Sequence, residues 1–123
     1  MHPARLRRIA HSEVGRVLKE LPAEIREAAA ACRVDCVLMA ECVADGEVLE
    51  DDLLGLFEGC SLADPEAETA AHLPSVRLFV DNLWEFAGGN VRRFRNEVRL
   101  TLLHELGHYL GLDEAGVAEL GLA

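Results

Sequence analysis

The residues with the clearest capacity for chemistry lie in the run His104-Glu105-Leu106-Gly107-His108. A helix turns about 100° per residue, so side chains four positions apart lie on one face. His104 and His108 can therefore give two nitrogens to one metal ion, and this spacing favours zinc. Glu105 lies beside that face, where a general base can take a proton from a metal-activated water. A catalytic zinc site also needs a third protein ligand and one open position.

The third ligand is predicted from the residues that follow His108. Gly111 can adopt the left-handed conformation that ends a helix, after which the chain can turn back toward the metal. In the spacing H-E-x-x-H-x-x-G-x-x-H the third ligand falls at position 114, which is Glu114 here. Asp113 is the alternative, one residue earlier and with a shorter side chain. A more distant glutamate is not expected, because Glu119 is the only acid after Glu114.

The motif also has an interpretation without a metal. H-E-x-x-H fixes only three positions and recurs by chance in helices, where a histidine pair can simply be solvated or satisfied by neighbours. Here a helical run precedes the motif, and Gly111 and an acidic residue follow at the expected offsets. Together these features favour metal binding over a purely structural helix.

Length and charge limit the class of protein. A chain of 123 residues, half of them apolar, is predicted to form one domain over residues 1–123. A net charge of −10 argues against nucleic acid or an anionic membrane as a partner. A local group of arginines is an exception to this negative charge. We interpret it as the solvated face of a helix; the alternative is a basic rim that attracts an acidic substrate. These arginines are Arg92, Arg93, Arg95 and Arg99.

The cysteines and the N-terminus indicate a cytoplasmic protein. The four cysteines form no C-x-x-C pair, and Cys36 and Cys42 fit small buried hydrophobic residues. No apolar segment follows the basic N-terminus as it would in a signal peptide, and no run is long enough to span a membrane. We therefore expect a reduced, cytoplasmic location without a membrane partner.

Hydrophobic periodicity predicts the elements that position the motif. Two N-terminal helices are expected to pack against a sheet built from alternating segments. Asn90 is the expected N-cap of a long helix that carries the motif, and an apolar stripe with a period of four anchors that helix in the core. The helices are predicted over residues 4–20, 22–31 and 91–110, and the strands over 34–41, 53–59 and 76–81.

Four runs of this sequence resemble the small bacterial zincin-like metallopeptidases, which reduce the zincin fold to about one domain. They are Leu21-Pro22, residues 53–59 (LLGLFEG), residues 101–108 (TLLHELGH) and residues 119–121. The LLGLFEG run is the most telling, because it holds no chemistry that would make it recur independently. The resemblance implies an α+β, minimal zincin-like fold: a small mixed sheet packed against helices, with the metal motif on the long C-terminal helix.

The resemblance also implies a metal site at His104, His108 and position 114. The family usually has aspartate at this third position, whereas this chain has Glu114. No methionine follows the motif, so the methionine turn of metzincins is absent from this sequence.

Two functional hypotheses follow. The first is a Zn²⁺-dependent peptidase with Glu105 as the general base and a peptide or protein substrate. The substrate would lie along a sheet edge, with residues 76–81 as the predicted edge strand, and Tyr109 and the nearby arginines are suggested oxyanion stabilisers. The second is a catalytically silent module that binds a metal, a peptide or a partner on a zincin scaffold.

Overall fold

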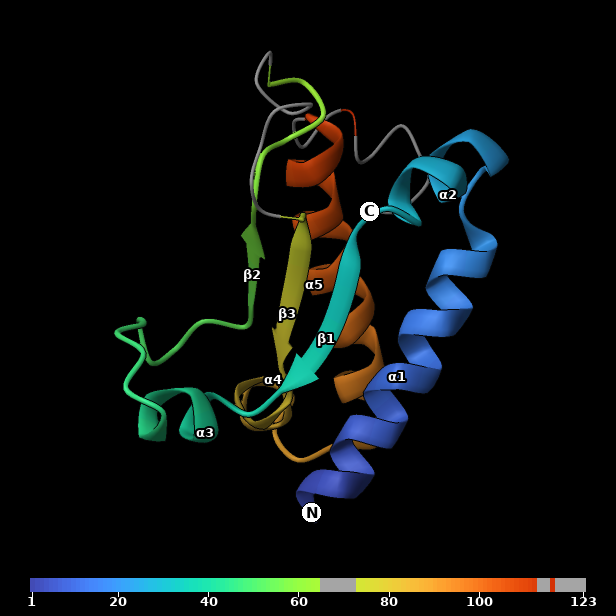
Figure 1. Ribbon diagram of the computed structural model, residues 1–123. Helices are drawn as coiled ribbons and strands as arrows, with labels where there is room; N and C mark the ends of the chain where they lie inside the picture. Colours follow the sequence, from blue (N-terminus) through green and yellow to red (C-terminus); the bar gives the residue numbers. More distant parts are fainter. Residues whose placement is uncertain (65–72, 113–115, 117–123) are drawn as a thin grey trace.

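Three strands form one sheet, and helices cover it (Figure 1). The computed structural model describes residues 1–64, 73–112 and 116. This α+β architecture, with a small mixed sheet and the histidine motif on the long C-terminal helix, confirms the predicted fold class. In chain order the elements are α1 (Pro3–Glu20), α2 (Ala23–Ala29), β1 (Arg33–Val37), α3 (Met39–Ala44), β2 (Gly55–Glu58), β3 (Ser75–Phe79), α4 (Val80–Phe86) and α5 (Val91–Leu110).

The strand order is β1-β3-β2, so β3 lies in the centre of the sheet. β3 pairs in parallel with β1 and antiparallel with β2; Leu78, for example, is opposite Cys36 on one side and Gly55 on the other. The prediction that residues 76–81 offer a free sheet edge is therefore wrong, because β3 is paired on both sides. Among the described strands, β2 is the edge strand that packs on α5.

The main core lies between the sheet and the two long helices, α1 and α5. Val76 and Leu78 of β3 are fully buried there, and so are Phe94, Val98 and Leu102 of the predicted α5 stripe. The ends of α5 also follow the prediction. Its N-cap, Asn90, accepts a hydrogen bond from the Arg93 N–H, and Gly111 at the other end has a left-handed φ of 72°. Local sequence signals and core packing therefore fix the helix that carries the motif.

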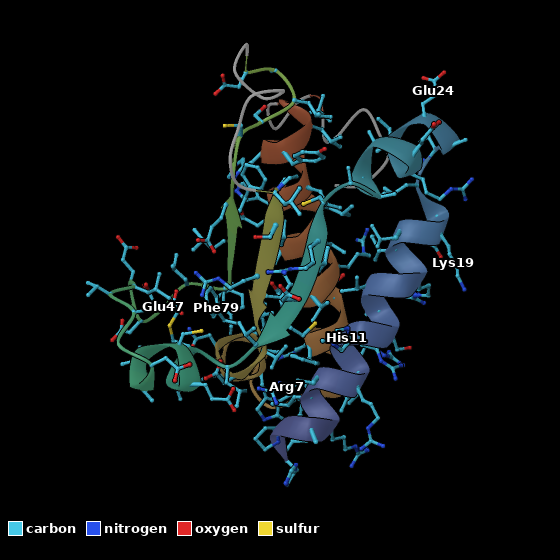
Figure 2. All side chains as sticks on the ribbon, in the orientation of Figure 1. Arg7, His11, Lys19, Glu24, Glu47 and Phe79 are labelled. Atoms are coloured by element: carbon cyan, nitrogen blue, oxygen red, sulfur yellow. The ribbon has the colours of Figure 1, made fainter. Side chains whose placement is uncertain are left out.

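A smaller cluster of buried residues covers the opposite face of the sheet: Met39, Cys42 and Phe79. Phe79 and Glu47 lie on the side of the sheet that carries α3 (Figure 2), and Arg77 contacts both of them. The prediction of a strand over residues 34–41 is partly wrong, because β1 ends at Val37 and α3 begins at Met39.

Asp81 supplies the reason for this early end of the strand. Its Oδ1 accepts the Met39 N–H at 2.8 Å and its Oδ2 accepts the Ala40 N–H at 3.2 Å. Residue 81 was itself predicted to end a strand, but it lies in the first turn of α4. A contact between residues about 40 positions apart thus caps α3 and overrides the local alternation, which is a tertiary effect.

Replacing Asp81 with alanine is expected to lower the free energy of unfolding by about 1–3 kcal/mol, because two N–H groups at the start of α3 lose their acceptor. Urea denaturation followed by circular dichroism measures this loss. Asp35→Ala is the matched control, since its carboxylate makes only a partly exposed pair with Arg33 and should cost less than about 0.5 kcal/mol. Equal losses in the two variants would show that the cap contributes little.

The four cysteines are free thiols. Cys32, Cys36 and Cys42 are buried, and burial raises the pKa of Cys32 and Cys36 to about 11. These two side chains therefore stay neutral near pH 7 and act as small core residues. None of the helices in the described part of the chain combines the length and apolar character needed to cross a bilayer.

Candidate metal site

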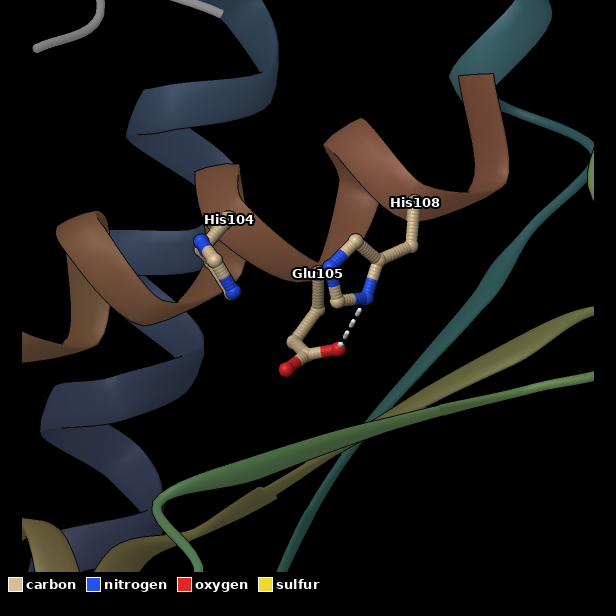
Figure 3. Close-up of side chains that lie close together, drawn as sticks. All are labelled: His104, Glu105 and His108. Carbon is tan, nitrogen blue, oxygen red and sulfur yellow. Dashed lines mark ion pairs between the residues drawn. The ribbon is translucent and has the colours of Figure 1, made fainter. Parts of the chain in front are cut away.

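Helix α5 brings His104, Glu105 and His108 together on the side that faces β2 (Figure 3). One potential ligand atom from each residue lies within 4.8 Å of the others, and the two imidazole rings have centroids 4.7 Å apart. Both histidines are exposed, whereas Glu105 is only 9% exposed. Imidazole nitrogens are ligands that zinc accepts, so the two accessible histidines on one helix face fit the expected metal.

The carboxylate of Glu105 is held on one side only. Its Oε2 accepts the N–H of Phe57 at 3.1 Å and lies 3.2 Å from Nδ1 of His108, the contact drawn as a dashed line in Figure 3. Within the described part of the chain, no hydrogen bond reaches Oε1. The side chain is thus oriented through one oxygen, while the other stays open to accept a proton. The contact uses Nδ1 of His108, and its Nε2 makes no bond with a described residue.

Gly55 allows β2 to approach α5 at this point. A Cβ atom at position 55 would lie 2.6 Å from Cγ2 of Thr101 and 3.2 Å from Cγ of Glu105. Glycine in a strand often marks such a close approach, but the sequence does not reveal which residues approach it. The absence of a side chain at position 55 therefore sets the distance between the edge strand and Glu105.

Gly55→Ala is expected to destabilise the fold by about 1–3 kcal/mol and to move β2 away from Glu105, because the added methyl group overlaps Thr101. Thr101→Ser removes the overlapping Cγ2, so the double variant Gly55→Ala/Thr101→Ser should recover most of the loss. Chemical denaturation of the four proteins in this double-mutant cycle measures the coupling. If the stability losses of the two single variants simply add in the double variant, the close approach to Thr101 is not what destabilises Gly55→Ala.

A hollow of about 370 Å³ lies next to His104, between the start of β2 and α5. Its apolar character comes from Leu54 and Leu100, and Leu100 is 36% exposed. Leu54 belongs to the LLGLFEG run noted in the sequence, whereas Leu100 was not identified, although it lies outside the apolar stripe of α5 and could have signalled a second surface. Six residues line the hollow: Leu54, Gly55, Leu100, Thr101, His104 and Glu105.

The C-terminal end of α5 is held against the segment that follows β2. The N–H of Leu62 donates to the carbonyl of Tyr109 at 2.7 Å. A Cβ atom on Gly111 would lie 2.6 Å from Cβ of Ala63, so only glycine fits this contact and its left-handed conformation. The turn that was predicted to lead toward a third ligand therefore begins where expected.

The third ligand itself is not tested. Glu114 and Asp113 lie outside the described residues, as does His72, so the choice of Glu114 stays a prediction. The described part of the chain contributes two histidines and Glu105 to the cluster.

The position of Tyr109 does not support its suggested role as an oxyanion stabiliser. It is 3% exposed, belongs to the main core and packs on the ring of Phe57 with centroids 5.9 Å apart. Burial raises its pKa, which keeps the phenol neutral. The arginines before the motif line other hollows than the one beside His104.

A family model described as zincin-like metallopeptidase matches residues 33–122. The matched stretch holds all three strands and the whole of α5, including the His104, Glu105 and His108 cluster. The chain therefore belongs to the zincin-like metallopeptidase family, which indicates a metal-dependent, peptidase-type function. A search of curated proteins found no match.

Proposed function

We propose that the protein is a zinc-dependent peptidase in which His104, His108 and Glu114 bind the metal and Glu105 is the general base. The observation that carries the proposal is the His104, Glu105 and His108 cluster on α5. When bound, zinc would lower the pKa of water toward neutrality and polarise the scissile carbonyl. The family match supports a metal and peptidase-type chemistry.

Glu105 carries the proton transfers in this mechanism. Its Oε2 is fixed by the Phe57 N–H, so its free Oε1 can take a proton from the attacking water. The water oxygen then bonds to the carbonyl carbon, and the C–N bond breaks. Glu105 returns the proton to the departing amine nitrogen, so that the carboxylate is regenerated. The low exposure of Glu105 limits exchange of this proton with bulk water.

We infer that the substrate lies extended along the free edge of β2. Among the described strands β2 pairs only with β3, so the main-chain groups of its other edge, apart from the Phe57 N–H that Glu105 accepts, can bind a peptide as an added strand. Gly55 places this edge against the turn of α5 that holds Glu105. The hollow lined by Leu54 and Leu100 would then receive an apolar substrate side chain.

A specific observation also favours the second hypothesis, a silent binding module. No arginine or lysine of the described residues lines the hollow beside His104, so no permanently charged donor for the developing oxyanion is provided there. A protein with this site could hold a metal or a peptide without turnover.

Metal analysis of protein purified without chelators tests the proposed site. We expect about one zinc ion per chain, and loss of this zinc in His104→Ala/His108→Ala. His11→Ala is the matched control, because His11 is an exposed histidine on α1 (Figure 2). The proposed site is wrong if the wild type takes up no added zinc, or if the double variant keeps it.

A further inference from the structure

A second hollow, of about 530 Å³, lies where α1 meets the N-terminal half of α5. Four of the residues that line it are arginines, one from α1 and three from α5, in a chain whose net charge is −10. We call this feature the arginine groove and define it by Arg16, Arg92, Arg95 and Arg99. The groove concentrates positive charge on an otherwise acidic protein.

The three arginines of α5 have no counter-charge within the described fold. Arg92, Arg95 and Arg99 make no hydrogen bond or ion pair with any residue in the described ranges, whereas Arg16 pairs with Glu13. The Glu13 side chain is 5% exposed, so it forms part of the buried wall and its charge is matched by Arg16. The groove therefore presents three uncompensated guanidinium groups.

Their position in the helix is unfavourable for stability. Arg92 and Arg95 lie near the N-terminus of α5, where the helix dipole disfavours cations, and the first turn contains no acidic residue. Arg95 is also three residues from Arg92 and four from Arg99, the spacings at which like charges repel on a helix. A segment that breaks these local rules without a compensating contact is typical of a functional site.

The arginine groove is separate from the metal site. Arg99 precedes His104 by five residues, which corresponds to about 7.5 Å along the helix and about 140° around it. The two hollows also share no lining residue. A ligand in the groove would not lie on the histidines.

We propose that the arginine groove binds a short chain of phosphates, either free or carried by a nucleotide. Guanidinium groups match phosphate oxygens in a bidentate fork, and Arg92 to Arg99 span about 10 Å of one helix ridge. The volume is within the range of small-molecule sites, and the net charge of −10 disfavours a long nucleic acid.

The surface next to the groove distinguishes the two sources of phosphate. A neighbouring hollow shares Arg92 and Asn96 with the groove and is lined by Phe86, which is 64% exposed. An exposed ring beside clustered arginines can stack on a base while the guanidinium groups hold the phosphates. A nucleotide would therefore bind more tightly than free triphosphate.

Calorimetry at low ionic strength, with inorganic triphosphate and ATP as probes, tests the proposal. Both should bind, and Arg95→Gln/Arg99→Gln should weaken binding by about tenfold or more. Arg8→Gln/Arg33→Gln is the matched control: it removes the same charge at exposed residues outside the groove and should change affinity much less. Because both probes chelate metals, His104→Ala/His108→Ala is included and should bind them like the wild type.

Three results would overturn the proposal: no binding of either probe, equal weakening in the two arginine variants, or loss of binding in the histidine variant. Tighter binding of hexaglutamate than of triphosphate would also overturn it and would assign the groove to an acidic polypeptide. The variant Phe86→Ala distinguishes the two sources of phosphate. If a nucleotide is the ligand, this variant should bind ATP more weakly and bind triphosphate like the wild type.

Discussion

Replacing Glu105 with glutamine is expected to slow peptide hydrolysis by about 100- to 10,000-fold while zinc stays bound. Glutamine keeps the size of the side chain, and its amide oxygen can still accept the Phe57 N–H, so the site should keep its shape. It lacks the basic oxygen that takes the proton from water. The effect is measured as kcat on a substrate selected from a peptide library, together with the zinc content of each preparation.

Glu85→Gln is a suitable control for this experiment, because it removes one acidic charge from an exposed position of α4. It should leave both kcat and zinc content unchanged. If Glu105→Gln cleaves peptides as well as the wild type with zinc bound, Glu105 is not the base. If the zinc-loaded wild type cleaves no peptide of the library, the silent binding module becomes the better description.

Glu114→Ala is expected to lower the affinity for zinc by about 100-fold or more, since it removes one of three protein ligands. Asp113→Ala should have a much smaller effect if the spacing from Gly111 selects position 114. Competition with a coloured chelator gives both dissociation constants, and Glu119→Ala serves as the acidic control. The reverse order, with Asp113→Ala the more damaging change, would assign the third ligand to Asp113.

The helix that carries the site was predictable because its signals are local. Asn90 and Gly111 mark its ends, and the spacing of His104 and His108 places them on one face. The apolar stripe was also visible, because the period of a helix is a property of neighbouring residues. The two histidines proposed to bind the metal could therefore be placed together without knowledge of the rest of the fold.

Features that depend on distant residues were not predictable from the sequence. The order of the strands, which makes β2 the edge and β3 the centre, is set by pairing across the chain. The end of β1 depends on Asp81, and the fit of Gly55 depends on Thr101. No periodicity encodes such contacts. The residue types therefore predicted strands at both β2 and β3, but the choice of β3 as the edge strand was wrong.

The hydrogen bond that orients Glu105 has a consequence for how this site can evolve. Its donor is the main-chain N–H of residue 57, a group that every amino acid except proline possesses. Mutation at position 57 can therefore replace phenylalanine by many residues without removing the donor. Selection for the orientation of Glu105 acts instead on the path of the strand, and hence on the glycine at position 55. Relatives should accordingly vary more at 57 than at 55.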